Sequence, residues 1–153
     1  MTSSGDSSEF VERARERILD HAKKRRRAGL TDKLYAVARS ETGILYEGVP
    51  FETSMPQFNF CAERHAINEM LYAEPEAGTL DAILVATPAP DETAPPPTPC
   101  GACRHAIAEF GDDATVLCTT FVREDDGWTT FPRVERFTGD ELYPDHQGHP
   151  SWE

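Results

Sequence analysis

The sequence predicts an α/β sandwich, and three observations support this fold class. The chain has 153 residues, a length that fits one domain with a single core. Apolar residues recur with helical spacing in some segments and form compact, strand-like runs in others. These segments follow one another in the order α, β, β, α, β, α, β, β, so strands alternate with helices in the middle of the chain.

The first expected helix covers residues 10–27, where apolar side chains repeat every three or four positions between charged ones. Residues 1–8 are small and polar, and we expect a disordered tail there. The basic run from Lys23 to Arg27 closes the helix, and Gly29 stops it. This run is interpreted either as an anion or RNA patch or, preferably, as a cationic helix end that complements the helix dipole.

Turn residues delimit the later elements. Ser40-Glu41-Thr42-Gly43 is a good hairpin turn, and Gly111 ends a helix that begins at Cys103. The segment 88–99 holds six prolines in twelve residues and is expected to be a stiff, extended loop. The expected strands cover residues 33–39, 44–51, 82–87, 114–122 and 129–134, and the second helix runs from Cys61 to Glu74-Pro75.

Composition narrows the function classes. The formal net charge is −12, and such an acidic surface disfavours a polynucleotide partner. No apolar stretch approaches the roughly 20 residues that a membrane helix needs, and residues 1–10 lack the pattern of a secretory signal. We therefore expect no membrane association and a cytoplasmic location, where four cysteines suggest metal binding or catalysis more than disulfides.

Three cysteines form the strongest motif. Cys100 and Cys103 are three residues apart at the start of an expected helix, which is a common half-site for zinc, and Cys61 begins another helix. Helix N-termini favour thiolates, and three thiolates leave one tetrahedral position for water, the catalytic arrangement. The alternative is a structural zinc with a fourth ligand from Cys118 or a histidine, although Cys118 lies in an apolar strand and is better interpreted as a core residue.

The residues beside these cysteines suggest hydrolysis. Glu63 is two residues past Cys61, close enough to move protons without binding the metal. Arg64 is expected to hydrogen-bond to the sulfurs and offset their charge, and Arg104 is expected to share this work. For His65 and His105 two interpretations stay open, a donor near the metal ligands or a packing residue.

Cys61-Ala62-Glu63-Arg64 and Pro99-Cys100-Gly101-Ala102-Cys103-Arg104 resemble the signature of the small cytidine deaminases. The resemblance spans roughly residues 33–144 and implies a three-layer α/β/α sandwich with a five-stranded mixed sheet. It also implies one zinc ion per subunit and a homotetramer whose sites borrow residues from neighbouring subunits. The implied reaction is hydrolytic deamination of a small amino-heterocycle, most readily cytidine or deoxycytidine, by zinc-bound hydroxide with Glu63 as the proton shuttle. The domain is expected to cover residues 9–144, with a tail or lid at 145–153 that contains His146, His149 and Trp152.

The resemblance is weaker at the substrate positions. Glu52 matches the family's ribose-binding glutamate, but Pro50 stands where an asparagine is usual and Asp32 where an aromatic residue is usual. Phe51 and Ala62 complete the expected substrate-binding residues. These departures keep a second substrate class open: a nucleoside antibiotic of the blasticidin S type, an aminopurine or a pterin. Two alternatives are less favoured. One is a binding protein in which zinc only stabilises the fold and catalyses nothing, and the other is an enzyme that edits polynucleotides.

Overall fold

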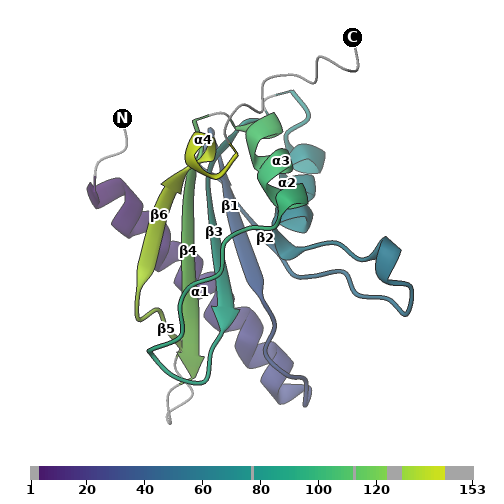
Figure 1. Ribbon diagram of the computed structural model, residues 1–153, viewed down its shortest axis with the longest axis vertical. Helices are drawn as coiled ribbons and strands as arrows, with labels where there is room; N and C mark the ends of the chain where they lie inside the picture. Colours follow the sequence, from purple (N-terminus) through teal and green to yellow (C-terminus); the bar gives the residue numbers. More distant parts are fainter. Residues whose placement is uncertain (1–3, 77, 112, 124–128, 144–153) are drawn as a thin grey trace.

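A computed structural model describes residues 4–76, 78–111, 113–123 and 129–143 of the chain. Within these residues the chain folds around one sheet, with helices on both faces (Figure 1). In chain order the elements are α1 (Ser4–Arg27), β1 (Tyr35–Ser40), β2 (Leu45–Gly48), η1 (Pro56–Phe58), α2 (Ala62–Ala73), β3 (Leu80–Pro88), α3 (Gly101–Phe110), β4 (Thr115–Arg123), β5 (Thr129–Thr130), β6 (Val134–Thr138) and α4 (Gly139–Leu142).

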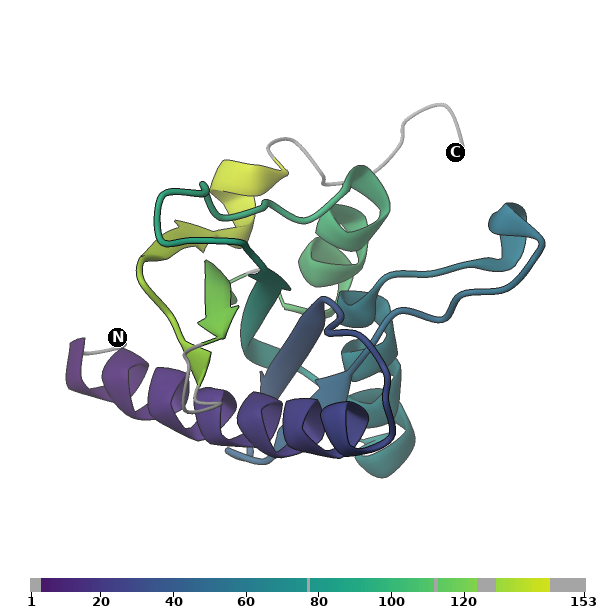
Figure 2. The same ribbon diagram turned by 90° about the horizontal axis from the view of Figure 1, so that it is seen from below.

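The sheet is mixed. Its strands lie in the order β2-β1-β3-β4, with β6 along the outer edge of β4 and the two-residue β5 beside the C-terminal end of β4. The pair β3–β4 is parallel and the other pairs are antiparallel. Helix α1 covers one face, while α2 and α3 cover the other (Figures 1 and 2). The predicted three-layer sandwich with five main strands is confirmed, and β5 is a short addition to it.

Alternating side chains divide the core between the two faces of the sheet. On β1, Ala36 and Ala38 pack toward α2 and α3, whereas Tyr35 and Val37 pack toward α1. The small alanines let α2 approach the sheet closely. Gly48 at the end of β2 continues this close contact, because a Cβ atom there would lie 2.3 Å from the carbonyl oxygen of Ala62. This packing fixes the start of α2, where the functional residues gather.

Several element boundaries differ from the sequence-based expectations, most clearly those of α1 and of the last main strand. Helix α1 begins at Ser4 and so includes residues 4–8, where the sequence predicts a disordered tail. Those residues lack the apolar positions from which a helix is recognised, yet they extend a helix that the buried Phe10 and Ala14 hold against the sheet. The last main strand is β6 at Val134–Thr138, not residues 129–134, and the capping box of Thr138 and Glu141 then starts α4.

An arm joins β2 to α2. The expected strand to Phe51 ends at Gly48, and residues 51–60 then leave the body of the molecule as two extended segments with η1 at their tip (Figures 1 and 2). Phe51 and Phe60 pair across the base of this arm through backbone hydrogen bonds, and their rings stack with centroids 5.0 Å apart. The arm returns the chain to Cys61 at the start of α2.

The parallel pair β3–β4 requires a crossover, and α3 supplies it. The proline-rich segment leaves the end of β3 without helix or strand and leads directly to Cys100, as predicted. Among the described helices, none combines the length and the apolar character needed to span a bilayer. His146, His149 and Trp152 lie outside the described residues, so their predicted roles stay predictions.

Candidate active site

The three predicted cysteine ligands meet where the N-termini of α2 and α3 come together. Cys61 is the N-cap residue of α2, Cys100 is the N-cap residue of α3, and Cys103 lies in the first turn of α3. Their sulfur atoms all lie within 4.8 Å of one another, and the Sγ atoms of Cys61 and Cys100 are 3.6 Å apart. Two helix dipoles therefore direct their positive ends at three sulfurs.

This donor set fits zinc. Tetrahedral zinc with Zn–S bonds of about 2.3 Å places its sulfur ligands about 3.8 Å apart, close to the spacing found here. In the described part of the chain, these three cysteines are the one group of side chains arranged to hold a metal ion. Cys118 is fully buried in β4 as part of the core, as predicted. Three protein ligands form the catalytic rather than the structural arrangement.

The cluster requires a cation to balance it. Burial raises the pKa of the Cys103 thiol, and the Glu63 carboxylate raises it further. Burial also raises the pKa of Cys61. At Cys100 burial acts in the same direction, but hydrogen bonds from the backbone and side chain of Cys103 prevail and lower the pKa. Holding all three residues as thiolates in this partly buried place therefore requires a strong positive charge, which a zinc ion provides.

Glu63 lies beside this cluster and is almost completely buried. Its side chain is 3% exposed, and Oε2 has no hydrogen-bond partner. Burial raises its pKa, partly offset by hydrogen bonds with its own backbone and the Cys103 thiol. A buried carboxylate with an unpartnered oxygen is unfavourable for folding and typical of an acid–base group. The structure places Glu63 next to the sulfurs, as the sequence predicted.

Arg64 and Arg104, both expected at the sulfurs, have different surroundings. Nη2 of Arg64 lies 4.0 Å from Sγ of Cys61. Burial opposes the charge of Arg64, but hydrogen bonds with Cys61 and Cys103 prevail and raise its pKa. Arg104 instead donates to the carbonyl oxygens of Pro99 and Leu142, at 2.7 and 3.0 Å.

The expectation for Arg104 therefore needs correction in this structure. Its guanidinium also donates to Oγ1 of Thr98, at 3.0 Å, so these hydrogen bonds go to the proline-rich segment and to the end of α4. The reason is helical geometry: Cys103 is buried toward the sheet, and the next residue of α3 points about 100° away from it. These hydrogen bonds hold in place the segment that leads into Cys100.

The two histidines of the motifs contact neighbouring segments. Nδ1 of His65 accepts a hydrogen bond from the backbone N–H of Val49, at 3.1 Å. His105 pairs with the hydroxyl of Tyr143, with Nδ1 and Oη 3.2 Å apart. Both histidines join α2 or α3 to neighbouring segments, which agrees with the packing interpretation.

A cavity of about 480 Å³ opens beside Cys61 and Arg64. Its walls come from the segment before β1, the base of the arm and the end of β3. Of the expected substrate-binding residues, Glu52 and Phe51 line it, as do Pro50 and Asp32. Its other lining residues are Lys33, Leu34, Asn59, Phe60, Thr87 and Pro88.

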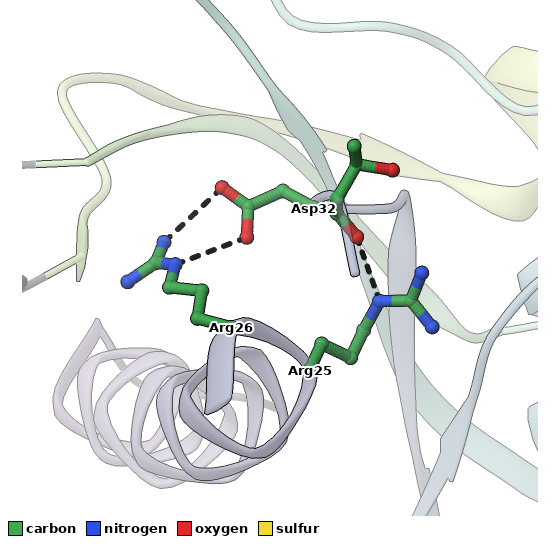
Figure 3. Close-up of polar contacts among 4 residues, drawn as sticks. Arg25, Arg26 and Asp32 are labelled. Atoms are coloured by element: carbon green, nitrogen blue, oxygen red, sulfur yellow. Dashed lines mark hydrogen bonds and ion pairs between the residues drawn. The ribbon is translucent and has the colours of Figure 1, made fainter. Parts of the chain in front are cut away.

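Ala62 and Asp32, two residues at the substrate positions, differ in their relation to the cavity. Ala62, expected at the substrate, is fully buried and does not line the cavity, because the first turn of α2 presses it against Gly48. Asp32 does line the cavity, but two hydrogen bonds from Arg26 hold its carboxylate (Figure 3). Lys33 forms an ion pair with Glu52 at the same wall. A lysine before a strand carries no recognisable signal, so only the fold identifies it.

Comparison with known proteins decides the family. The family model described as the cytidine and deoxycytidylate deaminase zinc-binding region matches residues 8–119. The chain belongs to this deaminase family. A cytidine deaminase from Sporosarcina psychrophila is 30% identical over 99 residues, which cover 65% of this chain and 68% of that protein.

The fold of this chain resembles those of solved deaminase structures. Cytidine deaminase from Burkholderia pseudomallei is 30% identical, with a TM-score of 0.58 over 74% of this chain and 80% of the other. Cytidine deaminase from Mycobacterium tuberculosis, at 20% identity and a TM-score of 0.50 over 76% and 79% of the two chains, supports the fold alone. Together with the cysteine cluster, family membership makes this chain a zinc-dependent deaminase.

Proposed function

We propose that this deaminase converts cytidine or deoxycytidine to the corresponding uracil nucleoside, with Glu63 carrying the protons. The observation that supports this role is the carboxylate of Glu63, buried beside Cys103 with Oε2 unpartnered. Cys61, Cys100 and Cys103 would hold the zinc ion. When bound there, zinc supplies Lewis acidity that makes water a better nucleophile at neutral pH.

The work of the protein is then proton transfer. Water adds to the ring carbon that carries the amino group, and Glu63 accepts the proton that the water loses. Glu63 delivers this proton to the ring nitrogen, then accepts the second water proton from the new hydroxyl group and delivers it to the departing amine. The C–N bond breaks, ammonia leaves, and the carbon keeps the water oxygen as a carbonyl. A raised pKa suits Glu63 to this exchange, because the group must both accept and donate.

Ammonia release and metal content test this proposal together. The zinc-loaded protein should release ammonia from cytidine and deoxycytidine. Glu63→Gln should lose roughly 10²- to 10⁴-fold in kcat while keeping one zinc ion per chain. Glu76→Gln, at an exposed position beyond α2, is the matched control and should retain activity. Full activity of Glu63→Gln, or its loss of zinc, would refute the proton-carrying role.

A second substrate class has specific support. Pro50 offers no side-chain donor to the cavity, and the Asp32 carboxylate held by Arg26 is not an aromatic ring, so two contacts expected for an ordinary nucleoside are missing. These features favour a blasticidin S-type nucleoside antibiotic, an aminopurine or a pterin. A panel of these compounds beside cytidine separates the classes. Turnover of cytidine with a kcat/KM at least equal to that of every other compound would eliminate the alternatives.

We further infer a homo-oligomer, with a tetramer as the expected form. The arm supports this inference, because Phe58 at its tip is 59% exposed and Met55 is 47% exposed. Apolar side chains on a projecting arm suit contact with a neighbouring subunit. Light scattering should give the mass of four chains, and Phe58→Asp should reduce it, whereas Ile44→Asp on the β1–β2 turn should not. A monomeric wild type would contradict the inference.

The cytoplasmic location of the protein stays a prediction from the sequence.

A further inference from the structure

Lys33 and Glu52 form an ion pair at the wall of the active-site cavity. Lys33 comes from the segment before β1, and Glu52 comes from the base of the arm after β2. The Lys33 ammonium donates a hydrogen bond to Oε1 of Glu52, and both residues line the cavity beside Cys61. Their side chains are 35% and 53% exposed, so a ligand can reach both.

Three other polar residues of the cavity wall, Arg64, Asp32 and Asn59, have partners elsewhere. Arg64 faces the cysteine sulfurs, and Arg26 holds Asp32. Oδ1 of Asn59 accepts a hydrogen bond from the backbone N–H of Thr53, at 2.6 Å. Lys33 and Glu52 face each other within the cavity wall. They can therefore exchange their mutual contact for contacts with a substrate.

The end of α1 fixes the position of Lys33. Nε and Nη2 of Arg26 bind the two carboxylate oxygens of Asp32, at 3.2 and 3.1 Å (Figure 3). Nε of Arg25 donates to the backbone carbonyl of Thr31, at 2.8 Å (Figure 3). Two consecutive arginines thus hold the two residues that precede Lys33. The basic end of α1 therefore organises the cavity wall.

A neighbouring ammonium and carboxylate match a hydroxyl group. The hydroxyl oxygen accepts a hydrogen bond from Lys33, and its proton is donated to Glu52. The pair carries no net charge, so a phosphate gains little attraction from it. We propose that Lys33, together with Glu52, binds sugar hydroxyl groups of the substrate and is a specificity-determining residue. This inference rests on the proposed nucleoside substrate.

The test compares substrates that differ in their hydroxyl groups. Rates of ammonia release by the zinc-loaded protein are measured with cytidine, 2′,3′-dideoxycytidine and 5′-deoxycytidine. The variants are Lys33→Met, Lys33→Arg and the control Lys24→Met, an exposed lysine of α1. Calorimetric binding of uridine provides a readout without turnover. Thermal melting verifies that each variant is folded.

Lys33→Met should raise KM for cytidine roughly 10- to 100-fold with little change in kcat, the loss expected for a hydrogen bond to a charged group. Its preference for cytidine over one of the deoxygenated substrates should shrink by the same factor, and uridine should bind correspondingly weaker. Lys33→Arg should recover part of this loss, and Lys24→Met should match wild type. An unchanged preference in an active Lys33→Met enzyme overturns the role of Lys33 alone. A wild type that releases no ammonia from cytidine and binds no uridine overturns the proposed substrate as well.

Discussion

Arg64 lies one helical turn beyond Cys61, and its Nη2 atom is 4.0 Å from the Cys61 sulfur. The guanidinium thus places a positive charge beside a donor set of three sulfurs. Without it, the thiolates would leave a bound zinc ion too electron-rich to act as a strong Lewis acid. Arg64 therefore connects the geometry of α2 to the chemistry of the metal.

Replacing Arg64 by Met should lower kcat about 10- to 100-fold, as is typical for residues that contact metal ligands. Zinc analysis and steady-state kinetics of the purified variant would check this prediction. Arg64→Lys keeps the charge but not the planar donor geometry, and we expect an intermediate kcat. Wild-type kcat in the zinc-loaded Arg64→Met protein would show that the sulfurs need no compensating charge.

Arg104 offers the matched comparison, since it directly follows the ligand Cys103, whereas Arg64 lies three residues after the ligand Cys61. Its contacts go to Pro99, Leu142 and Thr98. Arg104→Met should lower the free energy of unfolding by about 1–3 kcal/mol through lost hydrogen bonds. Its kcat should fall much less than that of Arg64→Met. Denaturant unfolding beside kinetics distinguishes the two arginines, and the opposite pattern would mean that their roles are reversed.

Gly48 tests the close packing that sets the start of α2. In Gly48→Ala the new Cβ would lie 2.3 Å from the carbonyl oxygen of Ala62, so the backbone must shift. We expect a loss of about 1–3 kcal/mol in the free energy of unfolding. Gly101→Ala is the control, because a Cβ there meets nothing within 4 Å. Equal stability of the two variants in urea would contradict the packing described here.

Glu74 at the end of α2 gives a pH-dependent prediction. Hydrogen bonds from the side chains of Tyr46, Thr42 and Ser40 lower its pKa below the ordinary 4.5. A lowered carboxylate pKa contributes stability that is present above pH 4.5 and is lost as the pH falls through the folded-state value. Tyr46→Phe should therefore move the pKa of Glu74 upward, as NMR titration of the carboxyl carbon would record. An unmoved pKa would exclude Tyr46 as its main cause.

Tyr46 itself should show the reciprocal effect at alkaline pH. Its hydrogen bond to Glu74 raises the pKa of the phenol to about 12. A raised pKa contributes stability below the ordinary value of 10.0, and this contribution is lost as the pH rises toward 12. Ultraviolet titration of wild type against Glu74→Gln would check this, with a lower Tyr46 pKa expected in the variant.

Local sequence patterns predicted the elements and the metal ligands well, because both depend on short spacings. Cys100 and Cys103 share one helical turn, and Glu63 follows Cys61 in the first turn of α2. The boundaries of α1 and the last main strand were less predictable, since tertiary packing rather than local pattern fixes them. Lys33 and the surroundings of Arg104 depend on contacts between distant segments, which no local pattern encodes.

The central claim is a zinc ion held by Cys61, Cys100 and Cys103 beside a Glu63 that is not a ligand. Zinc-edge X-ray absorption of the loaded protein tests it most directly. The claim predicts three sulfur neighbours at about 2.3 Å and one oxygen neighbour at about 2.0 Å, with the same sulfur shell in Glu63→Gln. A fourth sulfur or a histidine nitrogen in the zinc shell, or a shell altered by Glu63→Gln, would contradict it.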